Sequence, residues 1–173
     1  MVCLKDGLDK MELLKMDRED EKRYRKILTG IYDNEKALMM KQFIQHGVIS
    51  TYEHCDRVAR MCYRINKSTG EKADMDILVR AAFLHDFFLY DWHEKKLKNK
   101  IHGFTHPKCA SQNAKKYFNV SRREQKIIES HMWPLTIHRI PTSREAWILC
   151  LADKYVASEE TVMMRKKKEK YVN

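Results

Sequence analysis

Apolar residues recur along this chain at intervals of three and four, the spacing typical of partly buried helices. The clearest segment runs from Ser50 to about residue 67, and Ser50 with Glu53 forms a capping-box pattern at its start. Residues 77–86 are apolar on nearly all sides. This predicts that they form the central buried helix.

Similar patterns predict helices at residues 35 to about 46, 107–118, 122 to about 132, and from 142 or 143 to about 164. Gly47 is expected to end the first of these, and Pro107 to occupy the first turn of the second. No run alternates between apolar and polar residues for long enough to predict a strand. The expected fold class is all-α, a single helical bundle.

Composition supports one helical domain. The 173 residues include only 5 Gly and 3 Pro, and the length matches one domain. We expect residues 1–45 to be an N-terminal helical extension that packs on the core, residues 46–164 the main domain, and residues 165–173 a basic C-terminal tail.

The net charge of +10 only weakly favours anionic partners, because much of the excess lies in the loop at residues 95–100 and at the C-terminus. The five cysteines are scattered without CxxC spacing, which indicates reduced thiols. The N-terminus has no apolar signal region, and no stretch approaches 18 apolar residues. We therefore expect a soluble, cytoplasmic protein that does not bind membranes.

Four predicted helices each carry a metal-competent side chain close to an apolar face. His85 and Asp86 end the most apolar helix, where an isolated carboxylate would be costly to bury. The alternative is that this pair caps the wet end of the helix. His54, His131 and Asp153 lie on three other helices, and bundle cores are where such residues assemble metal sites. Imidazole and carboxylate donors suit Fe, Mn, Ni, Co or Zn, and the lack of thiolate argues against structural zinc.

The order His54, His85-Asp86, Asp153 resembles the H…HD…D pattern of the HD superfamily of metal-dependent phosphohydrolases. LVRAAFLHDFF is similar to the central helix of that superfamily, and CLADKYVA to its last ligand helix. The resemblance covers about residues 50–160, so the main domain at residues 46–164 would be an HD domain.

His106 and His131 lie between the HD pair and Asp153, in a spacing similar to the H…HD…H…H…D variant. In that variant two further histidines hold a second metal, so the resemblance favours two ions over one. The alternative for His106 is an exposed loop residue beside a helix start. Members of this variant include phosphodiesterases, nucleotide hydrolases and a few diiron oxygenases.

The resemblance implies a set of site residues. The metal ligands would be His54, His85, Asp86, His106, His131 and Asp153. Asp86 would bridge the ions, and Asp153 would orient or deprotonate the nucleophile. Basic residues nearest to the ligands in sequence are candidates for phosphate binding, namely Lys154, Arg57 and Lys108. The sequence does not identify the general acid.

The expected function is metal-dependent hydrolysis of a phosphoester or phosphoanhydride, with a small phosphorylated substrate and a nucleotide first among these. One alternative is a diiron oxygenase on the same ligands. Another is a non-catalytic module that binds nucleotides or nucleic acid, although nucleic acid is not favoured. The sequence leaves open the exact substrate, the metal and the oligomeric state.

Overall fold

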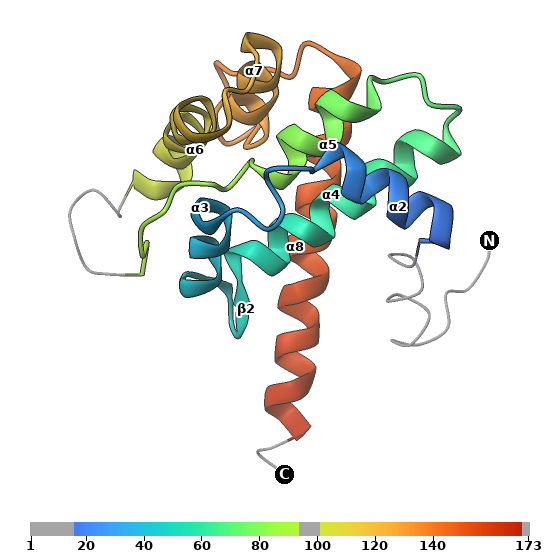
Figure 1. Ribbon diagram of the computed structural model, residues 1–173. Coiled ribbons are helices and arrows are strands. Elements are labelled where there is room, and N and C mark those ends of the chain that lie inside the picture. Colours follow the sequence, from blue (N-terminus) through green and yellow to red (C-terminus); the bar gives the residue numbers. More distant parts are fainter. Residues whose placement is uncertain (1–15, 94–100, 171–173) are drawn as a thin grey trace.

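The computed structural model describes residues 16–93 and 101–170 of the chain (Figure 1). The elements, in chain order, are α2 (Arg18–Ile27), α3 (Glu35–Leu38), η1 (Met39–Gln42), β1 (Ile44–His46), β2 (Ile49–Ser50), α4 (Thr51–Ser68), α5 (Met75–Phe83), α6 (His102–Phe118), α7 (Arg122–Ser130) and α8 (Arg144–Lys170). Within the described residues, the β structure is limited to the antiparallel pair β1–β2. The predicted all-α fold class is confirmed.

Helices α4 and α5 form the centre of the bundle. The Ser50 side chain accepts a hydrogen bond from the Glu53 backbone N–H, and the Glu53 carboxylate accepts one from the Ser50 backbone N–H. The capping box predicted for α4 is therefore confirmed. Asp74 caps α5, which packs against α4, α7 and α8. These contacts place the C-terminal end of α5 inside the bundle.

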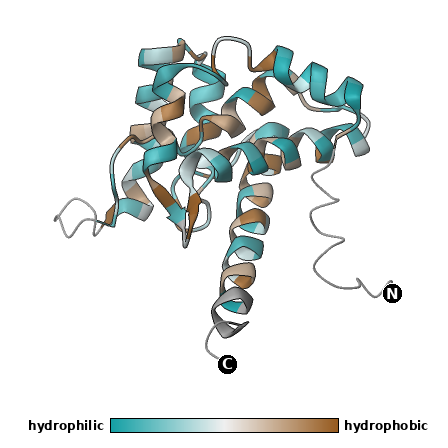
Figure 2. Ribbon diagram, turned by 60° about the horizontal axis from the view of Figure 1, so that its bottom comes forward, coloured by the Kyte–Doolittle hydropathy of each residue, from teal (hydrophilic) through white to brown (hydrophobic). Residues whose placement is uncertain are grey.

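The longest helix, α8, crosses the bundle and extends beyond the other described elements (Figure 1). Its N-terminal half packs on α4, α5 and α7 and buries residues such as Leu149, Ala152 and Val156. The extended part contains both hydrophobic and hydrophilic residues (Figure 2), and Val162 and Met163 are about half exposed. Asp153 thus lies in a part of α8 that is fixed by packing.

The helix predicted for residues 35–46 is wrong beyond residue 42. The chain forms α3 and the short η1, and then turns into the β1–β2 hairpin. Gly47 has a φ of 61° and provides the left-handed turn residue of this hairpin, so it does not end a helix there. Strands of three and two residues are too short to show the alternation that identifies a strand in a sequence.

Two helix boundaries also differ from the prediction. α6 begins at His102, so Pro107 lies inside the helix and does not occupy its first turn. α5 ends at Phe83, so His85 and Asp86 lie in the turn that follows and not in the helix itself. The start of α6 and the end of α5 both lie where polar side chains come together. The spacing of apolar residues gives no information about such positions.

The N-terminal helix α2 packs on this core. Tyr24 and Leu28 are fully buried, and the Tyr24 hydroxyl donates to Asp56 Oδ1 on α4 at 2.8 Å. Residues 1–15 of the expected N-terminal extension and the lysines of the loop at residues 95–100 lie outside the described residues. The domain boundaries stay predictions.

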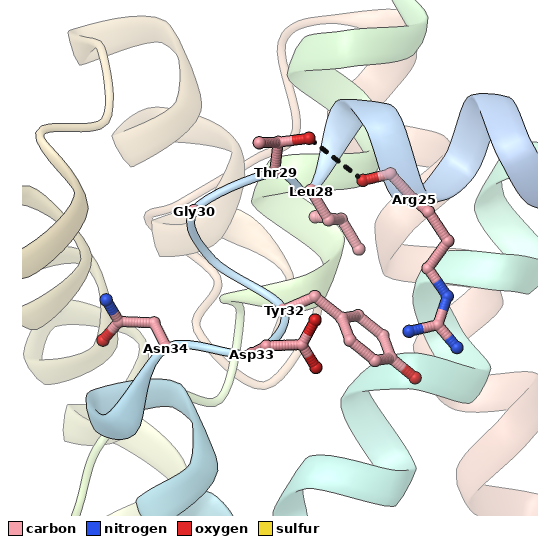
Figure 3. A pocket seen from close by; sticks show the side chains of 7 residues that line it. All are labelled: Arg25, Leu28, Thr29, Gly30, Tyr32, Asp33 and Asn34. Carbon is pink, nitrogen blue, oxygen red and sulfur yellow. Dashed lines mark hydrogen bonds between the residues drawn. The ribbon is translucent and has the colours of Figure 1, made fainter.

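A pocket of about 400 Å³ lies at the connection between α2 and α3 (Figure 3). It is lined by Arg25, Leu28, Thr29, Gly30, Tyr32, Asp33 and Asn34. The Arg25 guanidinium lies 3.8 Å from the Tyr32 ring centroid. None of the predicted metal ligands lines this pocket.

Across residues 16–93 and 101–170, no helix is both long enough and apolar enough to cross a lipid bilayer.

Candidate metal centre

The first predicted ligand, His54, lies in the first turn of α4 and is fully buried. Its Nε2 atom is 3.1 Å from Asp153 Oδ1 on α8. The capping box of Ser50 and Glu53 fixes the start of α4, and thereby the position of His54 along the helix axis. The contact between α4 and α8 therefore brings together two residues that are 99 positions apart in the sequence.

His85 and Asp86 lie in the turn after α5, and both are buried. His85 Nε2 is 3.5 Å from Asp86 Oδ2 and also 3.5 Å from Asp153 Oδ1. The alternative that this pair caps an exposed helix end is wrong, because neither side chain is more than 3% exposed. The turn brings His85 to Asp153 on α8, and Asp86 to His106 and His131.

His106 on α6 and His131 at the end of α7 complete the cluster. Their Nε2 atoms are 3.0 Å apart, and they lie 3.2 Å and 3.6 Å, respectively, from Asp86 Oδ1. His106 is only 4% exposed and belongs to a helix, so the alternative of an exposed loop residue is wrong. All six predicted ligands therefore meet at one place, with Asp86 between the two parts of the cluster.

Main-chain carbonyl groups fix the protonation of three of the histidines. His85 Nδ1 donates to Ala82 O at 2.7 Å, His106 Nδ1 to His102 O at 2.8 Å, and His131 Nδ1 to Ile128 O at 2.7 Å. A carbonyl oxygen can only accept, so each Nδ1 carries the proton. In the neutral ring, each Nε2 then presents a lone pair to the centre of the cluster.

This arrangement leaves acceptor atoms facing one another. The two Nε2 lone pairs of His106 and His131 would repel at 3.0 Å unless a cation lies between or beside them. Among the described residues, His85 Nε2 and Asp86 Oδ1 are buried without a hydrogen-bond partner. Unsatisfied buried acceptors are costly, and a metal ion, or in its absence a proton on His85, would satisfy these atoms. The residues therefore fit a metal centre.

The candidate ligands form three overlapping groups: His54, His85 and Asp86; His85, His131 and Asp153; and Asp86, His106 and His131. Within each group the potential ligand atoms all lie within 4.8 Å of one another. Nitrogen and carboxylate donors without thiolate suit divalent transition metals.

Without a metal, protons balance the two central carboxylates. Burial disfavours the charged form of His54, but its hydrogen bonds with Asp153 and Glu160 raise its pKa to about 10. Burial also disfavours the charged form of His85. The charge of Asp86 outweighs this effect and raises the pKa of His85 well above its usual value. Burial and the nearby His85 lower the pKa of His131 to about 3, so this ring is neutral. The site is therefore built to hold positive charge.

The comparison with protein-family models decides the family. The model of the HD domain matches residues 51–158, more than half of the chain. The chain belongs to the HD superfamily of metal-dependent phosphohydrolases. No curated protein and no solved structure gives a match.

Two buried polar residues that touch the centre of the HD domain were not predicted. Gln45 Nε2, from β1, donates to Asp86 Oδ2 at 2.6 Å. Glu160 Oε2, from α8, accepts from His54 Nδ1 at 2.9 Å. Both residues lie just outside the matched range. Glu160 is seven residues after Asp153, so the helical repeat could have placed both on one face; nothing in the sequence places Gln45.

The three basic residues predicted to bind phosphate have different surroundings. The Lys154 ammonium donates to His131 O at 3.0 Å, and the Arg57 guanidinium donates to Glu160 Oε1 at 3.3 Å. Lys108 is exposed on α6. Lys154 and Arg57 thus form hydrogen bonds with His131 and Glu160, respectively. Phosphate binding by any of the three stays a prediction.

Proposed function

We propose that this HD protein is a hydrolase that uses two divalent metal ions to cleave a small phosphoester or phosphoanhydride, with nucleotides as the first class to test. The observation that carries the proposal is the convergence of imidazole Nε2 atoms on Asp86, with three of the rings fixed by main-chain carbonyls. Metal-binding histidines commonly have such hydrogen bonds at their second nitrogen, because these orient the ring.

The position of Asp86 supports two ions. Its Oδ2 atom faces His85 at 3.5 Å, whereas its Oδ1 atom faces His106 at 3.2 Å. One oxygen is thus directed to each part of the cluster, as a bridging carboxylate requires. His54, His85 and Asp153 would hold one ion with Asp86, and His106 and His131 would hold the other.

Divalent ions bound here would polarise a phosphoryl oxygen and supply hydroxide near neutral pH. Asp153 is suited to orient the attacking water. Its side chain is 12% exposed, against 5% or less for each of the other five candidate ligands, so it faces the open side of the centre. We assign to Asp153 the role of orienting the attacking water and accepting its proton. We assign to Asp86 the role of fixing the distance between the two parts of the cluster.

The enclosure of the centre supports a small substrate. Measured over whole residues, the six candidate ligands are at most 8% exposed, so a terminal or projecting phosphate can reach them more readily than the backbone of a duplex. This favours nucleotides and other small phosphorylated compounds over nucleic acid.

The test is phosphate release from a panel of nucleotides and aryl phosphate esters, with protein reconstituted with Mn²⁺ and assayed under argon. We expect hydrolysis without oxygen, and a loss of at least 100-fold in Asp86→Asn. Asp91→Asn is the matched control, because Asp91 is exposed and lies five residues further along the chain. Substrate turnover that requires oxygen would favour the diiron oxygenase, and metal binding without turnover of any compound would favour a binding module.

A further inference from the structure

Glu160 is a buried carboxylate at the edge of the centre. It lies on α8 and is 1% exposed. Its Oε2 atom accepts from His54 Nδ1 at 2.9 Å, and its Oε1 atom lies 3.3 Å from the Arg57 guanidinium. Burying a carboxylate is unfavourable unless it is paired and hydrogen-bonded, so both contacts are needed to keep it there.

The acceptor at Nδ1 distinguishes His54 from the other three histidines. His85, His106 and His131 each donate from Nδ1 to a neutral carbonyl three or four residues earlier in the chain. His54 alone among these donates to a carboxylate, on a different helix. A charged acceptor gives a stronger hydrogen bond and makes the opposite ring nitrogen a better electron donor. The two parts of the cluster are therefore not equivalent.

The hydrogen bond between His54 and Glu160 also determines which nitrogen of the His54 ring carries the proton. With the proton on Nδ1 held by Glu160, His54 Nε2 points to Asp153 at 3.1 Å. In the other tautomer, Nδ1 would present a lone pair to a carboxylate, and Nε2 would carry a proton where a ligand atom is needed. With an ion at His54 Nε2, the contact with Glu160 excludes this tautomer, because two acceptors would face each other at 2.9 Å.

We propose that Glu160 is a positioning residue: it holds His54 with Nδ1 protonated and Nε2 directed at the metal centre, so that the ion on the His54 side binds more tightly than the ion held by His106 and His131. This inference rests on the proposed metal-dependent function. It adds a residue outside the range matched by the HD-domain model and an order of affinity for the two ions.

The test uses Zn²⁺ as the probe, in competition with a chromogenic chelator, on the full chain. For the wild type we expect two affinities. Glu160→Gln keeps an acceptor but removes its charge, and should weaken the tighter ion by about tenfold; Glu160→Leu removes the acceptor and should weaken it by up to about 100-fold. The weaker ion should change little in either variant.

Glu159→Gln is the matched control, since this neighbouring side chain is more exposed and accepts from the Tyr155 hydroxyl. It should bind Zn²⁺ as the wild type does. A second readout is the imidazole N–H signal of His54 in ¹H–¹⁵N spectra of the zinc-loaded protein. This signal should be present in the wild type, shifted in Glu160→Gln and absent in Glu160→Leu.

A purely structural role, in which Glu160 only ties α8 to α4, would lower thermal stability and leave zinc affinity and the His54 signal unchanged; that result would overturn the inference. Because Glu160→Gln is nearly isosteric, it remains informative if Glu160→Leu does not fold. Equal zinc affinity in wild type and variants would refute the role of Glu160 alone. Failure of the wild type to bind zinc would refute the proposed function and the inference together.

Discussion

Metal binding to this centre should release protons from the protein. In the absence of metal, hydrogen bonds to Asp153 and Glu160 hold the pKa of His54 at about 10 against the effect of burial, and the charge of Asp86 holds the pKa of His85 well above its usual value. His54 is therefore protonated at pH 7.5, and the raised pKa of His85 favours its protonated form. Each ring must lose a proton to bind a metal. His131 contributes none, because its pKa is lowered to about 3.

The direction and size of the effect follow from these groups. Because the metal competes with protons that the free protein holds up to high pH, apparent affinity should rise with pH, by about tenfold per pH unit for each proton displaced. His54 predicts about one proton at pH 7.5, and the raised pKa of His85 adds to this number. Deprotonation of a bound water can add to this number.

Calorimetric titration with Zn²⁺ in buffers of different ionisation enthalpy measures the number of protons released. His54→Gln provides the comparison, because it keeps a polar side chain but has no proton to lose. We expect this variant to release one proton fewer than the wild type, whatever the water contributes. Equal release by both proteins, or an affinity that does not change between pH 6 and 8, would refute the reasoning.

Three further substitutions test the structure around the centre. Gln45→Ala removes a hydrogen-bond donor to the Asp86 carboxylate and should weaken zinc binding by about 10–100-fold. Gln42→Ala, at an exposed position nearby, should not weaken it, and chelator competition measures both. Ser50→Ala removes the cap of α4 and should lower the free energy of unfolding by about 1 kcal/mol in urea titrations; an unchanged value would contradict the capping box. Leu84→Ala, at a fully buried position beside the HD pair, should lower it by about 2–5 kcal/mol, and Leu151→Ala, which is 60% exposed, by less than about 0.5 kcal/mol.

The sequence predicted the parts of the fold that depend on local signals. Ser50 and Glu53 begin α4 as their capping-box pattern indicated. Capping and apolar periodicity act within a few residues, so they can be identified without knowing the tertiary structure. The resemblance to the HD pattern supplied the six candidate ligands, and the structure brings all of them together.

Features that depend on distant contacts were missed. The hairpin at Gly47 is too short for a periodic signal, and its Gln45 side chain reaches Asp86, which is 41 residues away. Helix α5 ends just before His85, where the following turn carries His85 and Asp86 into the cluster. The spacing of apolar residues does not show this helix end. Glu160 could have been found, because a carboxylate two helical turns after Asp153 lies on the same face of α8.

The most direct test of the account is the metal content of the protein purified without chelator and then reconstituted, measured by elemental mass spectrometry beside Asp86→Ala. Six candidate ligands, with Asp86 shared between the two parts of the cluster, predict about two transition-metal equivalents in the wild type and a loss of both in the variant. One equivalent would contradict the two-ion centre and leave His106 and His131 outside it. No metal after reconstitution with Mn, Fe, Ni, Co and Zn, or equal content in the variant, would contradict the metal centre itself.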